Sequence, residues 1–164
     1  MSVVCAKVTK NRIIIGADSA ITLGQTQEEY TKIKKVNGMI VGGVGYSQEL
    51  GMFLLFCKTT KPRTASEDGV MDFISQFFDW AVAKTRNPKF SINNSYLLVF
   101  DKKLFSINNG FDIREITEHA ALGAGRDYAL ATLSLGKSVQ QSLKVACKLS
   151  IYCGEPISVM EVRK

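Results

Sequence analysis

The order in which strand and helix patterns follow one another constrains the fold of this chain more than any other feature of its sequence. The patterns run as strands, two helices, strands, two helices and one final strand. Neither block of strands can cover its own apolar faces, so each must pack against something else. The economical solution is two sheets packed face to face with a pair of helices outside each. We therefore expect an α+β fold, a four-layer αββα sandwich.

The first block of strands contains the clearest turn in the sequence. Lys32–Val36 alternates, Asn37–Gly38 follows as a two-residue turn, and Met39–Gly45 reads as the return strand. A turn of this kind needs positive φ at both central residues, which Asn and Gly tolerate. Two earlier strands are expected over Ser2–Val8 and Arg12–Gly16, because both segments are rich in small or β-branched apolar residues.

Helices are expected where apolar residues recur three and four positions apart. The expected helices cover about 50–57, 67–84, 126–135 and 139–152. Ser138 and Gln141 have the spacing of a capping box at the start of the last helix, and Gly154 followed by Pro156 predicts its end. The remaining strands are expected over 95–100, 103–107, 119–122 and 157–162.

Length and composition fit one folded domain. The chain has 164 residues, 46% of them hydrophobic and 22% charged, which is ordinary for a globular domain. We expect a single domain over residues 1–164. The longest obvious apolar run, Met52–Cys57, is far shorter than the about 18 residues that suggest a membrane span, and the N-terminus lacks the pattern of a signal peptide. No membrane partner is expected.

Charge and cysteine content predict neither a nucleic-acid partner nor a metal site. The 21 basic and 15 acidic residues give a net charge of +6, but the basic residues are scattered and aromatics do not interleave with them. Cys5, Cys57, Cys147 and Cys153 form no CxxC pair, and His119 is the one histidine, so we expect no metal and no cofactor. Reduced, buried thiols are typical of a cytoplasmic protein.

Ser2 is the first residue with chemistry of its own. If Met1 is removed, Ser2 carries a nucleophilic hydroxyl and the α-amine of the chain on adjacent carbons. An α-amine titrates at about pH 7.7–8.0, so a useful fraction is free base at neutral pH and can accept the hydroxyl proton. The alternative is a serine at the start of a strand behind a retained Met1.

A carboxylate and a lysine form the second and third candidates. In Gly16–Ser19 the carboxylate of Asp18 falls at the end of a buried strand, where a charge is costly unless it is paired. On a strand, Lys32 and Lys34 share one face while Ile33 faces the other way. A lysine beside Asp18 would lower the pKa of a nearby amine, while Asp18 keeps that lysine charged. A cap aspartate and a solvated lysine edge remain the alternatives.

In this order and spacing, these segments resemble the family of proteasome β-subunits and HslV, which are N-terminal nucleophile hydrolases. The resemblance covers nearly the whole chain and implies the same αββα layer order. It rests on the blocks Gly16–Ser19, Lys32–Ile33 before the Asn-Gly turn, Gly42–Gly45, and Gly123–Gly125 before a helix, and on residues 146–152.

The resemblance implies a peptidase that cleaves peptide amide bonds. Ser2 falls on the N-terminal nucleophile of the family, and Asp18 falls on its conserved carboxylate. Lys32 aligns with the catalytic lysine of the family if the loop before it is shorter than in the family. An alignment without a gap places Lys34 at that position instead. Gly45 falls where a backbone N–H forms the oxyanion hole.

Further implications concern the substrate and the assembly. Main-chain groups near Thr22 and Ser47 would flank an extended peptide or unfolded protein. The family implies a homo-oligomeric ring in the cytoplasm and allows an ATPase partner. This chain departs from the family pattern in its serine nucleophile, in Ala124 of the segment Gly-Ala-Gly and in Lys148, which replaces an acid. With a retained Met1, these departures favour the alternative of a catalytically inactive structural or assembly subunit.

Overall fold

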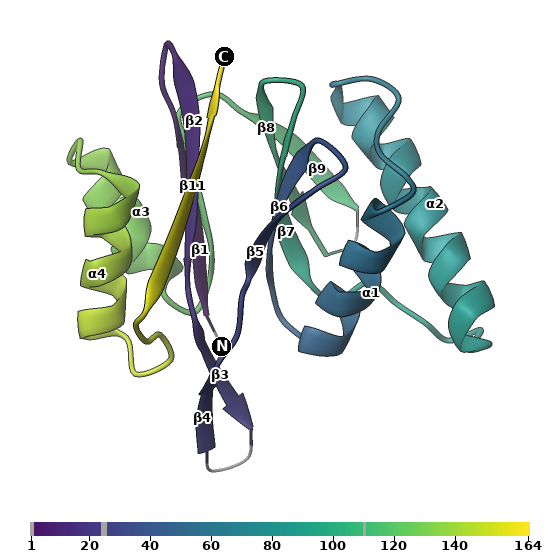
Figure 1. Ribbon diagram of the computed structural model, residues 1–164, viewed down its shortest axis with the longest axis horizontal. Coiled ribbons are helices and arrows are strands. Elements are labelled where there is room, and N and C mark those ends of the chain that lie inside the picture. The colour runs from purple at the N-terminus through teal and green to yellow at the C-terminus, as the bar shows by residue number, and fades with distance from the viewer. Residues whose placement is uncertain (1, 24–25, 110) are drawn as a thin grey trace.

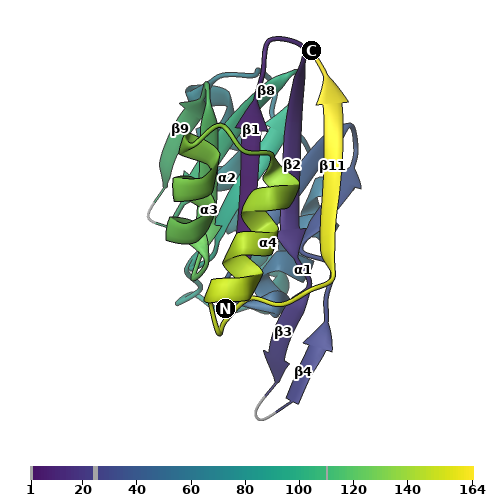
Figure 2. The same cartoon turned by 90° about the vertical axis from the view of Figure 1, so that its left-hand side faces the viewer.

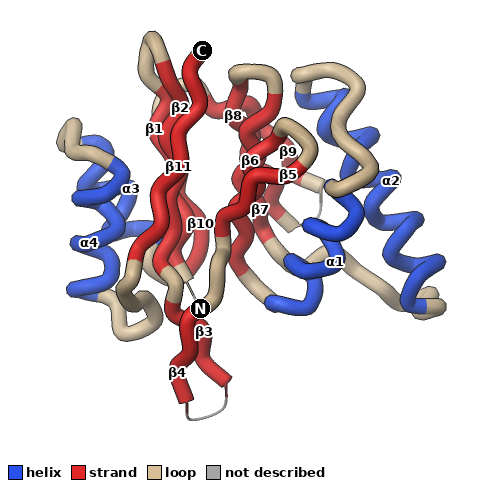
Figure 3. Tube along the Cα trace, in the orientation of Figure 1, coloured by secondary structure: helices blue, strands red, loops and turns tan. Residues whose placement is uncertain are grey.

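Two antiparallel sheets lie face to face at the centre of the molecule, and a pair of helices covers the outer face of each (Figure 1 and Figure 3). The computed structural model describes residues 2–23, 26–109 and 111–164, and for residues 21–23 and 26–29 it describes the backbone alone. The layer order helix, sheet, sheet, helix confirms the expected α+β four-layer αββα sandwich.

The first sheet carries the N-terminal strand at its centre. Its strands are β1 (Val3–Val8), β2 (Arg12–Asp18), β10 (His119–Gly123) and β11 (Ile157–Arg163). They pair in the order β10-β1-β2-β11, so β1 is hydrogen-bonded on both sides. Helices α3 (Arg126–Ser134) and α4 (Val139–Leu149) cover the outer face of this sheet, which is turned to the viewer in Figure 2.

The second sheet contains the predicted Asn-Gly hairpin. Its strands are β5 (Ile33–Val36), β6 (Met39–Val44), β7 (Ser95–Phe100), β8 (Lys103–Asn108) and β9 (Asp112–Ile116), paired in chain order. Asn37 and Gly38 have φ values of 49° and 79°, which confirms the predicted turn between β5 and β6. Helices α1 (Ser47–Cys57) and α2 (Glu67–Thr85) cover the outer face.

Three hydrophobic clusters fill the spaces between the four layers. Branched aliphatic residues such as Ile15 of β2 and Leu97 of β7 fill the space between the sheets. Aromatic residues dominate between the second sheet and its helices, where the ring centroid of Phe53 lies 4.9 Å from that of Phe77 and 4.3 Å from that of Tyr96. Small residues, Ala146 among them, let α3 and α4 approach the first sheet closely.

Helix ends follow the sequence signals in part. The Ser66 side chain caps α2 by accepting the Gly69 N–H at 3.1 Å, and Ser138 and Gln141 form the complete capping box of α4. The predicted end of the last helix at residue 152 is wrong. Helix α4 ends at Leu149 because Ser150 adopts an extended conformation, with φ −96° and ψ 123°.

Strand patterns missed one hairpin and one edge strand. Among the described residues, strands β3 (Ala20–Leu23) and β4 (Thr26–Glu29) form a two-stranded sheet of their own, and they project beyond one end of the sandwich (Figure 2). Strand β9 lies at the edge of the second sheet. Polar sequences such as Thr26–Glu29 carry no apolar alternation from which a strand could be predicted. None of the helices in the described ranges has the length and apolar character needed to cross a membrane.

Truncation of the aromatic core should destabilise the fold strongly. Phe53 is fully buried in α1, whereas Leu55 of the same helix is 50% exposed. We expect Phe53→Ala to lower the free energy of unfolding by about 3–5 kcal/mol, through lost burial and a residual cavity. Leu55→Ala, the matched control, should cost less than about 1 kcal/mol. Urea denaturation measures both values, and equal losses in the two variants would contradict this packing.

Candidate active site

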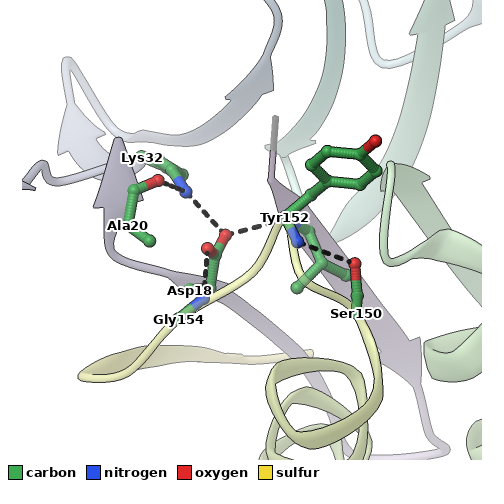
Figure 4. Close-up of polar contacts among 7 residues, drawn as sticks. Asp18, Ala20, Lys32, Ser150, Tyr152 and Gly154 are labelled. Atoms are coloured by element: carbon green, nitrogen blue, oxygen red, sulfur yellow. Dashed lines mark hydrogen bonds and ion pairs between the residues drawn. The ribbon is translucent and has the colours of Figure 1, made fainter. Parts of the chain in front are cut away.

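Asp18 forms a buried polar centre at the end of β2. Its side chain is fully buried, and its carboxylate accepts three hydrogen bonds (Figure 4). Oδ1 accepts the Val3 N–H at 2.8 Å and the Lys32 ammonium at 2.7 Å, and Oδ2 accepts the Gly154 N–H at 3.1 Å. These donors replace the water that the carboxylate loses on burial, which allows a charge at this depth.

Lys32 is buried beside Asp18 and also donates to the carbonyl of Ala20. Burial lowers the pKa of Lys32 from its ordinary value of 10.5, and the attraction to Asp18 offsets only part of this effect. The ammonium therefore loses its proton more readily than that of a solvated lysine. Its charge depends on the neighbouring carboxylate.

The predicted facing of the lysines is wrong in one respect. Lys32 and Ile33 are both buried, whereas Lys34 is exposed, so Lys32 and Lys34 do not share a face. The reason is that β5 begins at Ile33, and Lys32 precedes the strand in which side chains alternate. Of the two lysines, the geometry brings Lys32 to Asp18.

Ser2 immediately precedes β1 and is 7% exposed. Its carbonyl accepts the Gly125 N–H at 3.2 Å. Gly123, at φ +91°, lies so close that a Cβ there would meet the Ser2 carbonyl oxygen at 2.2 Å. Only glycine combines this backbone conformation with that approach. The turn 123–125 and the bond from Val3 to Asp18 therefore fix the peptide unit that joins Ser2 to Val3 at both its carbonyl and its N–H.

A small pocket brings together four of the residues that the sequence singled out. Ser2, Lys32, Gly45 and Ser47 all line it. Gly45 follows β6 with φ +125°, and Ser47 is the first residue of α1, where backbone N–H groups lack partners within the helix. Ser2 and Gly45 also line an adjoining groove of about 590 Å³, together with Ala124. Ser2 thus stands between a polar pocket and an open groove.

The other residues named from the sequence lie in varied places. Thr22 is in β3 and pairs with Gln27, but its side chain lies outside the described residues, as does all of Met1. Lys148 is exposed on α4, and it takes part in none of the hydrogen bonds recorded for Asp18 and Lys32 in the described ranges.

Sequence reasoning missed the backbone groups that complete the site. The Gly154 N–H and the Ala20 carbonyl contact Asp18 and Lys32, and no sequence pattern marks a main-chain group for such a role. It also missed Asn94, a fully buried side chain that lines the pocket of Ser2. One feature of the sequence could have pointed to the buried polar region around Asn94. Glu49 is a carboxylate next to the apolar Leu50 at the start of α1.

Nearby thiols are poor nucleophiles in this environment. Burial, with a smaller contribution from the charge of Asp18, raises the pKa of Cys147 to about 12. Burial likewise raises the pKa of Cys153. Because the thiolate is the reactive form, the raised pKa leaves very little of either sulfur in its reactive form at neutral pH. Within the described ranges, no group of three or more His, Cys, Asp and Glu side chains could hold a metal ion.

Comparison with known proteins finds sequence relatives among protease subunits. No family model matches the chain. Curated relatives include the ATP-dependent protease subunit HslV of Borrelia hermsii, 28% identical over 90% of this chain and 89% of that protein. HslV of Campylobacter hominis is 26% identical over 93% of this chain and 91% of that protein.

Solved structures with the same fold include three similar chains. BPH of Thiobacillus denitrificans in complex with epoxomicin has a TM-score of 0.88 at 17% identity and covers 98% of both chains. Anbu (ancestral beta-subunit) from Yersinia bercovieri has a TM-score of 0.74 at 14% identity, over 97% of this chain and 80% of that one. HslV from Trypanosoma brucei has a TM-score of 0.70 at 12% identity, over 99% of both.

The fold is therefore that of the proteasome-like N-terminal nucleophile hydrolases. Within this class, the sequence resembles the HslV protease subunits along nearly its whole length, as its motifs predicted.

The lowered pKa of Lys32 predicts how stability changes with pH. Between that pKa and 10.5 the unfolded chain binds more protons at residue 32 than the folded protein does, so the Lys32 contribution to stability rises with pH. The difference in unfolding free energy between wild type and Lys32→Met should therefore increase as the pH rises from neutrality towards 10.5. Lys34→Met, which replaces an exposed lysine outside this ion pair, is the matched control for the loss of a lysine side chain. Urea denaturation across this range tests the sign, and a falling difference for Lys32→Met would contradict it.

Proposed function

We propose that this chain is an N-terminal nucleophile peptidase that cleaves peptide amide bonds with Ser2 after removal of Met1. The observation that carries the proposal is the position of Ser2. It lines the same pocket as Lys32, and the next backbone N–H along the chain, that of Val3, donates to the Asp18 carboxylate. The resemblance to proteins named as protease subunits supports the same reaction.

The reaction proceeds through an ester intermediate. The free α-amine of Ser2 accepts the proton of the Ser2 hydroxyl, directly or through a water molecule, while the oxygen attacks the peptide carbonyl. The tetrahedral intermediate collapses as the C–N bond breaks, and the departing amine takes up the proton. Water then attacks the ester while the α-amine accepts a proton from it. The amine passes this proton to the Ser2 oxygen as the ester bond breaks, which releases the acid and restores the Ser2 hydroxyl.

Lys32, Asp18 and Gly45 support this chemistry. A charged Lys32 lowers the pKa of the adjacent amine by like-charge repulsion, which increases the fraction of free base. Asp18 keeps Lys32 charged despite burial and fixes Val3, the neighbour of the nucleophile. The Gly45 N–H donates to the oxygen of the tetrahedral intermediate, where the negative charge develops.

An extended peptide or unfolded protein is the proposed substrate. The groove of about 590 Å³ next to Ser2 would accept its chain. The family resemblance implies that main-chain groups near Ser47 and Thr22 would flank it. By analogy with the ATP-dependent protease subunits it resembles, the chain is proposed to form a homo-oligomeric ring in the cytoplasm and to work with an ATPase partner.

A catalytically inactive assembly subunit is the second candidate. Two observations favour it. Ala124 lines the groove without a hydroxyl that could support the α-amine, and Lys148 supplies no carboxylate. Intact mass separates the two functions, because loss of one Met residue frees the α-amine, whereas a retained Met1 blocks it.

Removal of the Ser2 hydroxyl should abolish peptide cleavage. We expect Ser2→Ala to lower kcat for a small peptide amide by about 10³-fold or more, since the variant cannot form the ester intermediate. Ser134→Ala, an exposed hydroxyl on α3, is the matched control and should retain wild-type turnover. Turnover is followed by release of a fluorescent amine from protein whose Met1 is absent by intact mass. Equal rates for Ser2→Ala and wild type would exclude this mechanism.

A further inference from the structure

One side chain, Asn94, holds the backbone of the segment that follows β6. Asn94 is completely buried just before β7. Its Oδ1 accepts the Tyr46 N–H at 2.6 Å, and its Nδ2 donates to the Tyr46 carbonyl at 2.8 Å. A single amide group thus binds both polar groups of one backbone residue, which fixes that residue in position and orientation.

A buried carboxylate holds Asn94 in turn. Glu49 of α1 is 6% exposed, and its Oε1 accepts the Asn94 N–H at 3.1 Å and the Tyr96 hydroxyl at 2.9 Å. Its Oε2 accepts the Asn93 N–H at 3.0 Å. Burial and the charge of Glu49 raise the pKa of Tyr96, so the phenol keeps the proton that it donates. The two oxygens of one carboxylate therefore hold the consecutive backbone N–H groups of Asn93 and Asn94.

Asn94 and its anchor Glu49 together form what we call the Asn94 clamp. The amide of this clamp lies directly against Gly45. A Cβ on Gly45 would meet the Asn94 Oδ1 at 2.1 Å, so the amide packs against the backbone of this residue. Gly45 and Tyr46 both line the small pocket of Ser2 and the adjoining groove. The amide that orients Tyr46 therefore also limits where Gly45 can lie relative to Ser2.

We propose that Asn94 is a positioning residue that keeps the Gly45 N–H aimed at the carbonyl oxygen of the substrate, with Glu49 as its anchor. The inference rests on the proposed function, because it assigns a partner to the oxyanion donor of that reaction. A preorganised donor stabilises a developing charge only from a fixed position, and a small displacement reduces its effect greatly. Neither Asn94 nor Glu49 is proposed to touch the reacting atoms.

Kinetics of Asn94 variants test this role. We expect Asn94→Ala to lower kcat by about 10–100-fold while KM changes by less than about 3-fold, since the donor matters most in the transition state. Asn94→Asp keeps an acceptor for the Tyr46 N–H and should fall between Asn94→Ala and wild type. Ser106→Ala removes a buried hydroxyl from β8 and should leave kcat unchanged. All rates are expressed per folded chain that begins with Ser2.

Hydrogen exchange provides a readout that does not depend on activity. In Asn94→Ala, the backbone amides of residues 45–47 should exchange faster than in wild type, whereas those of β8 should not change. Unchanged exchange at residues 45–47 would overturn the role of Asn94. So would a wild-type kcat in Asn94→Ala when Ser2→Ala is inactive, and in both cases the proposed function would stand. Faster exchange without any wild-type peptidase activity would support the clamp as structure and overturn both its catalytic role and the proposed function.

Tyr96→Phe keeps the test decisive if Asn94→Ala fails to fold. This variant removes one donor to Glu49 and leaves the ring in the aromatic core. A several-fold fall in kcat with KM preserved would support the anchor, and unchanged kcat together with unchanged exchange at residues 45–47 would overturn it.

Discussion

The buried ion pair between Asp18 and Lys32 joins parts of the molecule that are otherwise separate. Through Asp18 it binds the start of β1 at Val3 and the segment before β11 at Gly154, and through Lys32 it reaches the segment before β5. Removing either partner of such a pair leaves an uncompensated buried charge, which typically costs about 3–5 kcal/mol. The same pair therefore ties the two sheets together at one end, and its lysine lines the pocket of Ser2.

Three supports surround the pocket of Ser2 at this end of the sandwich. The ion pair fixes the residue after Ser2, the turn containing Gly123 and Gly125 fixes the Ser2 carbonyl, and the Asn94 clamp fixes the segment across the pocket. Each support comes from a different part of the chain, and each uses backbone groups. Such convergence restricts the backbone near Ser2 and near Gly45, which line the same pocket, as the preorganised reaction proposed above would require.

Sequence patterns predicted the layers well and the contacts of the site less well. The Asn37–Gly38 turn and the Ser138 cap are local signals, so they could be recognised without knowledge of the fold. The burial of Lys32 depends on where β5 begins, and the roles of Gly154 and Asn94 depend on chain segments that meet only after folding. Resemblance to a family pointed to Ser2, Asp18 and Lys32 together, whereas spacing alone left each with a simpler structural explanation.

The proposed hydroxyl nucleophile can be tested most directly by covalent trapping. An epoxyketone such as epoxomicin, which is bound to the similar BPH chain, is incubated with the protein, and the modified peptide is located by mass spectrometry. The account predicts one adduct, on a peptide that begins at Ser2. An unmodified protein, an adduct at another residue, or a mature chain that still begins with Met1 would contradict it.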